Sequence, residues 1–278
     1  MTQVDLRLDG VLPLVLSRTH VSSYRVGRLF GPSWASTLDQ RLEVDREGVC
    51  YAAPDGMLLR YPVPAAGGEP VWPVAGPRLA LAATWDGYQV VDAARGQTLH
   101  FTRPGPAVAE GVRSWPLTVV TDRAGNRIDV EYDDRDVPAA VRHSGGYHVL
   151  VDSAGGRVTG LRLVDPDRGP QVVVQYRHDT RGNLTAVINS SGEPMAFDYD
   201  GQGRLIAWTD RVEGWHRFDY DPQGRCVRTT GAGRMLERRL SYDQAAATTT
   251  VTDSLGHTSV YVCNPRGKVV RHVDELGR

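Results

Sequence analysis

The chain has 278 residues, with 32 basic and 33 acidic side chains and a formal net charge of −1. This balance excludes a dedicated nucleic-acid binder, which needs clustered Lys and Arg against the phosphates. Hydrophobic residues make up 41% and charged residues 23% of the chain, which excludes a disordered protein.

No segment has the features of a membrane span, a secretory signal or a metal site. The longest apolar stretches, 11–16 and 79–83, are far shorter than the roughly 20 residues that cross a bilayer. The N-terminus lacks the basic start, apolar core and cleavage site of a signal peptide. Cys50, Cys226 and Cys263 lie far apart, which predicts buried thiols without a disulfide framework or a bound metal.

Glycine and proline recur between short alternating segments along the chain, with 30 and 17 copies. No window of eleven or more residues carries a helical apolar stripe without a Gly or Pro inside it. The pattern therefore predicts an all-β protein. In chain order, we expect a hairpin from 88–91 and 98–101, and further strands at 128–132 and 158–161.

The second half of the chain contains a repeated turn motif. It has Asp or Asn first and Gly fourth, the residue preference of a type I turn. Clear copies lie at 179–182, 200–203, 221–224 and 264–267, and a weaker copy begins at 243. The starting positions are thus 21 or 22 residues apart.

The segments between these turns alternate as strands do. Phe197 and Tyr199 share one face, and Phe218 and Tyr220 repeat the arrangement one period later. A second series of turns lies between the first, so each period holds two strands. The spacing predicts a curved strip of antiparallel hairpins. A β-propeller, with four strands per blade, is the alternative.

The motif at 197–205, Phe-Asp-Tyr-Asp-Gly-Gln-Gly-Arg-Leu, resembles the YD repeat of the Rhs family, and 218–225 repeats it. The segments 12–24 and 31–42 resemble the region that precedes the repeats in actinobacterial Rhs proteins. We therefore divide the chain into an Rhs-type lead-in, 1–111, and a YD-repeat strip, 112–278. The repeat-motif residues are Asp179, Gly182, Phe197, Tyr199, Asp200, Gly203, Arg204, Phe218, Tyr220, Asp221, Gly224, Arg225, Asn264 and Gly267.

The resemblance implies a fold and a role. In this family, the hairpin strip spirals into a hollow β-cocoon around a toxic C-terminal domain, which is delivered into rival cells. We expect a structural shell segment of a polymorphic toxin used in interbacterial competition, without catalysis or cofactor. The expected partners are the toxin domain and the remaining repeats of a longer chain. Self-association through exposed strand edges is a further expectation. The expected location is cytoplasmic before delivery, then secreted or inside the target cell.

A binding module for carbohydrate or protein, at the cell surface or secreted, is the alternative function. Trp208 and Trp215 are the candidate stacking residues for a glycan. His143 and His148 are five residues apart near two glycines, and Asp residues cluster at 133–136. Turn residues explain both groups better than metal ligands, because the acidic segment lacks the Gly and Glu of an EF-hand.

Overall fold

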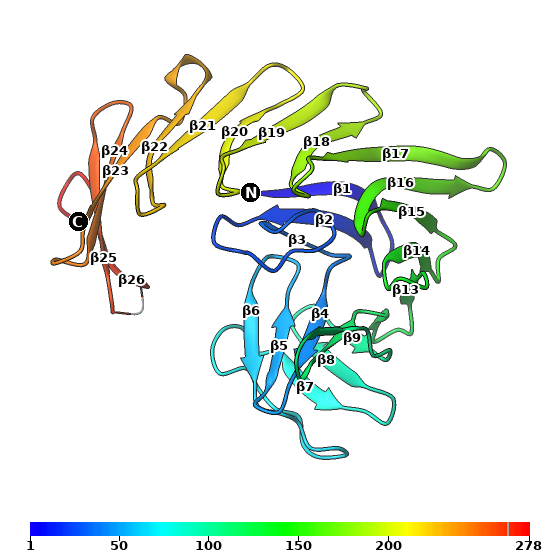
Figure 1. The fold of residues 1–278 in the computed structure, drawn as a ribbon. Coiled ribbons are helices and arrows are strands. Elements are labelled where there is room, and N and C mark those ends of the chain that lie inside the picture. The colour runs from blue at the N-terminus through cyan, green and yellow to red at the C-terminus, as the bar shows by residue number, and fades with distance from the viewer. Residues whose placement is uncertain (266) are drawn as a thin grey trace. The chain divides into compact units, whose positions relative to one another are not determined.

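The computed structural model describes residues 1–265 and 267–278, so Arg266 of the tetrad at 264–267 lies outside the described residues. The chain forms two compact units, Met1–Gly192 and Glu193–Arg278 (Figure 1). The division into 1–111 and 112–278 remains a prediction from sequence pattern. In the described residues the only helical element is one 3-10 turn, and no helix is long and apolar enough to cross a membrane.

The first unit is built from short strands. They are β1 (Thr2–Leu8), β2 (Leu14–His20), β3 (Trp34–Ser36), β4 (Arg41–Val44), β5 (Val49–Ala52), β6 (Leu58–Tyr61), β7 (Ala80–Ala83), β8 (Tyr88–Asp92), β9 (Gln97–Phe101), β10 (Ala107–Ala109), β11 (Val112–Pro116), β12 (Val119–Asp122), β13 (Arg127–Tyr132), β14 (Pro138–His143), β15 (His148–Ala154), β16 (Arg157–Asp165), β17 (Gly169–His178) and β18 (Leu184–Asn189).

The second unit continues the same pattern. It contains β19 (Pro194–Tyr199), β20 (Leu205–Thr209), β21 (Trp215–Tyr220), β22 (Cys226–Gly231), the 3-10 turn η1 (Ala232–Arg234), β23 (Arg238–Asp243), β24 (Thr248–Asp253), β25 (Thr258–Cys263) and β26 (Val269–Val273).

Antiparallel hairpins form a continuous ladder in each unit. In the first unit, β7, β8, β9 and β12 pair in this order, and the ladder continues strand by strand from β12 to β18. In the second, each strand from β19 to β26 pairs with the next. The predicted all-β hairpin repeat is therefore confirmed. The propeller alternative is wrong, because a blade ends its sheet after four strands and these ladders do not.

Two smaller sheets belong to the first unit. Strands β1, β2 and β3 form one, and β10, β11, β4, β5 and β6 form the other. In Figure 1 the blue strands β1 and β2 lie beside the green strands β16 and β17. The guanidinium carbon of Arg18 in β2 lies 5.3 Å from the ring centroid of Tyr176 in β17, which agrees with this view. The loop after β2 contacts the same strands: the Val158 N–H donates to the Leu29 carbonyl at 3.0 Å, and the Phe30 and Tyr176 rings are 4.9 Å apart.

A hydrophobic core lies between the five-stranded sheet and the hairpins that follow it. Leu42, Tyr51 and Leu59 come from the sheet, and Leu81 and Phe101 from β7 and β9. All five side chains are buried. Buried apolar surface contributes about 25 cal/mol of stabilisation per Å², and this burial holds the two layers together. The N-terminal segment thus packs on the start of the hairpin ladder.

Candidate functional site

Each repeat is closed at one edge of the ladder by a turn in which an aspartate bonds the backbone ahead of it. The Asp200 Oδ1 atom accepts N–H bonds from Gln202 and Arg204, at 2.9 and 3.0 Å. The Asp200 carbonyl accepts the Gly203 N–H at 3.0 Å, and Gly203 has φ +73°, where glycine is favoured. The residue types of the motif are therefore those that this backbone geometry requires.

The same bonding occurs throughout both units. An Oδ1 atom accepts N–H bonds from two and four residues ahead, and the carbonyl accepts one from three ahead. The turns of this kind begin at Asp122, Asp133, Asp179, Asp221, Asp253 and Asp274. Asn264 also accepts, from Lys268 at 3.0 Å and from Gly267 at 2.8 Å.

The residue four ahead of the aspartate also bonds its second oxygen. Arg204 Nε donates to Asp200 Oδ2 at 2.6 Å, and Arg225 Nε to Asp221 Oδ2 at 2.7 Å. Burial alone would raise the pKa of Asp200, but the hydrogen bonds from Arg204 outweigh it and lower the pKa. Asn183 bonds Asp179 Oδ2 in the same way, a role that we did not predict.

The arginine of one repeat also contacts the tyrosine of the next. The guanidinium carbon of Arg204 lies over the Tyr220 ring, 4.6 Å from its centroid, and the Tyr220 hydroxyl donates to the Leu205 carbonyl at 2.8 Å. We call Asp200, Arg204 and Tyr220 a repeat junction. It connects consecutive hairpins through an ion pair, a cation–π contact and a hydrogen bond.

A second repeat junction has the same geometry. Arg225 lies 4.6 Å from the centroid of the Tyr242 ring, and the Tyr242 hydroxyl donates to the Cys226 carbonyl at 2.7 Å. We did not predict a role for Tyr242. The signal was present in the sequence, because Tyr242 precedes the weak turn copy at Asp243 as Tyr220 precedes Asp221.

Phe197, Trp208 and Phe218 lie along one face of the ladder in the second unit. Phe197 is buried and lies opposite Trp208 in the ladder. The Trp208 ring stacks on His216 with centroids 5.8 Å apart, and His216 meets the edge of Phe218 at 4.9 Å. Tyr199 lies opposite Leu205 and is half-buried. These contacts describe side-chain packing along the ladder.

Trp208 and Trp215 do not share a surface. Trp208 pairs with His216, and the neighbouring pair is Thr209 with Trp215. Consecutive pairs in a ladder point to opposite faces of the sheet. The Trp215 ring is covered by Arg217, whose guanidinium carbon is 5.1 Å from the ring centroid. The two indoles therefore cannot form one stacking platform for a glycan.

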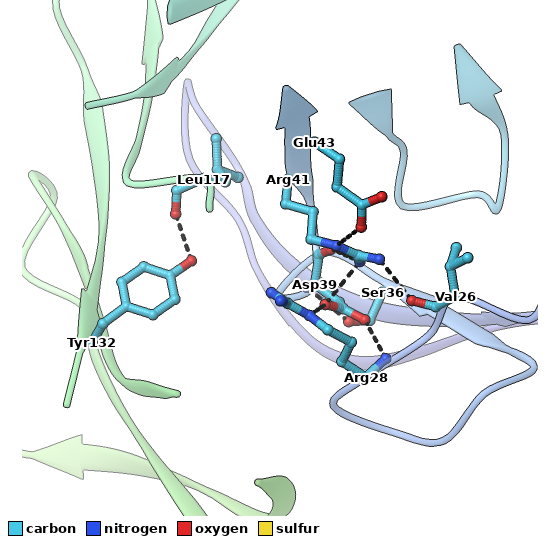
Figure 2. A network of polar contacts seen from close by, with 8 residues as sticks. All are labelled: Val26, Arg28, Ser36, Asp39, Arg41, Glu43, Leu117 and Tyr132. Carbon is cyan, nitrogen blue, oxygen red and sulfur yellow. Dashed lines mark hydrogen bonds and ion pairs between the residues drawn. The ribbon is translucent and has the colours of Figure 1, made fainter. Parts of the chain in front are cut away.

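A buried polar network holds the loop after β2 against β4 (Figure 2). The Arg28 N–H donates to Asp39 Oδ2 at 2.7 Å, and Arg41 Nη1 lies 3.2 Å from Asp39 Oδ1. Arg41 also bonds Glu43 Oε1 at 2.8 Å and the Val26 carbonyl at 2.7 Å. The Asp39 and Arg41 side chains are each only 2% exposed. Because both charges are bonded, the network fixes the path of this loop.

A second buried charge joins the N-terminal sheet to the hairpin ladder. Arg18 is 1% exposed and bonds both oxygens of Asp5, at 2.6 and 2.8 Å. Its guanidinium carbon lies 5.0 Å from the Trp34 ring centroid and 5.3 Å from that of Tyr176, which belongs to β17. Burial would lower the pKa of Arg18, but Asp5 outweighs it and raises the pKa. Nothing in the sequence alone marked this residue.

Of the candidates for metal binding, His143 contacts a distant segment and Asp133 closes a turn. His143 Nε2 bonds the Leu12 carbonyl at 2.7 Å, and Tyr147 donates to the Asp9 carbonyl at 3.1 Å. Asp133 closes a turn of the kind described above. Among the described residues, no group of three or more His, Cys, Asp or Glu side chains is arranged to hold a metal ion.

Comparison with known proteins shows what this chain is similar to. A family model described as a domain of unknown function, DUF6531, matches residues 1–61, and the RHS Repeat model matches residues 199–235. The chain is 28% identical to "Probable deoxyribonuclease RhsA" of Dickeya dadantii (strain 3937), over 95% of this chain and 18% of the relative. It is 26% identical to "Probable deoxyribonuclease RhsB" of the same strain, over 99% of this chain and 20% of the relative.

The chain thus spans about a fifth of the length of these curated relatives. Among solved structures, it is similar to the crystal structure of TcdB2-TccC3 without its hypervariable C-terminal region. This match has a TM-score of 0.43 and 13% identity, and it covers 96% of this chain and 14% of that chain. A second TcdB2-TccC3 crystal structure gives TM-score 0.42 and 10% identity, over 100% of this chain and 19% of that chain. The matched N-terminal region and repeat, together with the relatives that align over nearly the whole chain, support the resemblance of this chain to the Rhs, or YD-repeat, family.

Proposed function

We propose that this chain is a structural shell segment of an Rhs-type polymorphic toxin, which encloses a C-terminal toxin domain for interbacterial competition. The repeat junction is the observation that carries the proposal. Asp200 pairs with Arg204, Arg204 covers the Tyr220 ring, and the Tyr220 hydroxyl donates to the backbone. The same contacts recur one hairpin later. Side chains used in this way support a continuous wall.

The N-terminal sheets supply a fixed start for such a wall. Arg18 and Asp5 are buried against Tyr176 of β17, and His143 of β14 bonds the loop that follows β1. These contacts cover one face of the early hairpins with apolar and paired charged side chains. A covered face removes surface that would otherwise attract other chains.

We propose that the segment is not catalytic and needs no cofactor. Its curated relatives are called probable deoxyribonucleases, and this chain spans about a fifth of their length. In this proposal the nuclease activity of those relatives lies outside the matched segment. The partners of the segment are then the toxin domain and the other repeats.

The last described strand is a suitable place for further pairing. Val269 and Val270 of β26 are 56% and 64% exposed, and β26 pairs with β25 along its other edge. In this proposal, the edge of β26 that does not pair with β25 accepts another strand, from further repeats or from a second copy. We propose that the protein is cytoplasmic before delivery and acts outside the producing cell or in its target.

The natural gene product provides the test. The reading frame would be sequenced on both sides of this segment, and the ends of the purified protein would be mapped by intact mass. Limited proteolysis would follow, before and after the shell is unfolded with denaturant. We expect further Asp-x-x-Gly turns and a distinct C-terminal domain that becomes cleavable only on unfolding. A natural product that contains neither would overturn the proposal.

A further inference from the structure

A pocket lies between two adjacent hairpin tips of the first unit, the tip that joins β15 to β16 and the tip that joins β17 to β18. Its volume is about 450 Å³. The wall includes Arg157 and Thr159 from β16, Tyr176 and His178 from β17, and Arg181 from the turn that follows. The space is open to solvent and has room for a small ligand or one side chain of a larger one.

The Arg157 guanidinium is held flat against Gly182. The position that a Cβ atom would occupy on Gly182 lies 2.7 Å from Arg157 Nη2 and 3.0 Å from Nε. Arg157 Nε donates to the Gly182 carbonyl at 3.3 Å, while Gly182 has φ +80°. The missing Cβ thus makes room for the guanidinium, and one weak bond to a neutral carbonyl orients it.

The repeat junction shows what this arginine lacks. Arg204 also approaches the glycine of the next turn, because its Nη1 atom is 3.3 Å from the Cβ position of Gly224. Arg204, however, has the Asp200 carboxylate at 2.6 Å. Arg157 follows a tight hairpin turn at Gly155 and Gly156, and this turn contains no aspartate.

The carboxylates near Arg157 have other partners. Arg162 bonds both oxygens of Asp152, at 2.8 and 2.6 Å. Asp179 Oδ1 accepts the N–H groups of Arg181 and Asn183, and its Oδ2 accepts the Asn183 side chain. Across residues 1–265 and 267–278, no acidic side chain lies within 4.0 Å of the Arg157 nitrogens to form an ion pair.

His178 makes the pocket responsive to an incoming charge. Burial, and next the positive charge of Arg157, lower the pKa of His178 to about 4. An anion bound at Arg157 would offset that repulsion and raise the pKa of His178. The imidazole therefore serves as a reporter of occupancy.

We propose that the Arg157 pocket binds a carboxylate, which supplies the charge that Asp200 supplies to Arg204 in the repeat junction. The guanidinium is the binding group, since its planar donors match the two oxygens of a carboxylate. The carboxylate can be a free small molecule or the side chain of an acidic peptide. The site is independent of the shell proposal, because it needs only the first unit.

The test is an NMR titration of the full chain with acetate and, separately, with a hexaglutamate peptide, at constant ionic strength. The ring resonances of His178 are followed from pH 3.5 to 7. We expect either probe to shift these resonances and raise the pKa of His178. A tighter response to hexaglutamate would identify a polypeptide ligand, and an equal response per carboxylate would identify a small one.

Arg157→Gln should weaken binding at least about tenfold, which is the loss expected for a charged hydrogen-bonded pair. Arg168→Gln, at an exposed turn of the opposite hairpin end, is the matched control and should bind as the unaltered chain does. Arg157→Lys keeps the positive charge but lacks the paired planar donors of the guanidinium. It replaces Arg157→Gln in the titration if that variant does not fold. An unaltered chain that responds to neither probe, or a response that Arg157→Gln and Arg157→Lys retain in full, would overturn the proposal.

Discussion

The Arg204 guanidinium carbon lies 4.6 Å from the centroid of the Tyr220 ring, so a charged side chain of one hairpin covers an aromatic side chain of the next. The same arginine donates to Asp200 within its own turn. One residue therefore links the closure of a turn to the contact between repeats. This relationship explains why Asp, Arg and Tyr recur together in the motif.

Arg204 and Tyr220 should be energetically coupled. In a double-mutant cycle with Arg204→Ala and Tyr220→Ala, we expect a coupling of about 1 kcal/mol in the free energy of unfolding. Chemical denaturation measures it. Arg204→Ala with Tyr242→Ala is the matched control, because Tyr242 contacts Arg225 instead, and its coupling should be close to zero. Equal coupling in the two cycles would contradict the assignment.

Replacement of Asp200 by Asn should destabilise the protein less than its replacement by Ala. Asp200→Ala removes the acceptors for Gln202 and Arg204, and we expect it to cost about 2 kcal/mol of stability. Asp200→Asn keeps the backbone acceptor, as Asn264 does in its own turn, and should cost about half as much. The free energy of unfolding of both variants decides this. Equal losses would show that the ion pair, and not the turn, dominates.

Removal of the Asp5 carboxylate should strongly destabilise the first unit. Asp5→Ala leaves the Arg18 charge buried without a counter-ion, at a cost of about 3–5 kcal/mol. Asp9→Ala is the control, since its ion pair with Arg7 is exposed and should contribute less than about 0.5 kcal/mol. Thermal unfolding compares the two variants. A small loss for Asp5→Ala would mean that water reaches Arg18.

The first unit should lose stability as the pH falls from about 6.5 toward 4. Burial lowers the pKa of both His20 and His178 from 6.5 to about 4. Between these pH values the two histidines are protonated in the unfolded chain but stay neutral in the folded chain. Their contribution to the free energy of unfolding is therefore full above pH 6.5 and is lost on acidification. By pH 4.5, each histidine accounts for a loss on the order of 2 kcal/mol in the free energy of unfolding.

The double variant His20→Gln with His178→Gln should show a flatter dependence of unfolding free energy on pH between 7 and 4.5. Denaturant titrations at several pH values measure the slope. The paired turn aspartates have lowered pKa values, so their contribution is lost at more acidic pH, below about 3.8. An unchanged slope in the double variant would show that other groups take up the protons.

Local residue preferences determined much of this protein in advance. Asp200 and Gly203 are the residues that their turn requires, and the turn depends on a few neighbouring backbone groups. The same holds for Phe197 and Phe218, whose alternation along a strand assigns them to one face. Short-range geometry of this kind repeats with the motif, so hairpins and turns could be predicted from sequence.

Contacts between distant segments were decided only by the tertiary structure. His143 bonds Leu12 across a separation of 131 residues, and Arg18 meets Tyr176 on a strand far along the chain. No periodic pattern encodes such pairs, because they depend on how sheets pack after the strands have formed. Arg157 is a further case: only the folded chain shows that the turn at Gly155 leaves it against Gly182 without the carboxylate that Arg204 has.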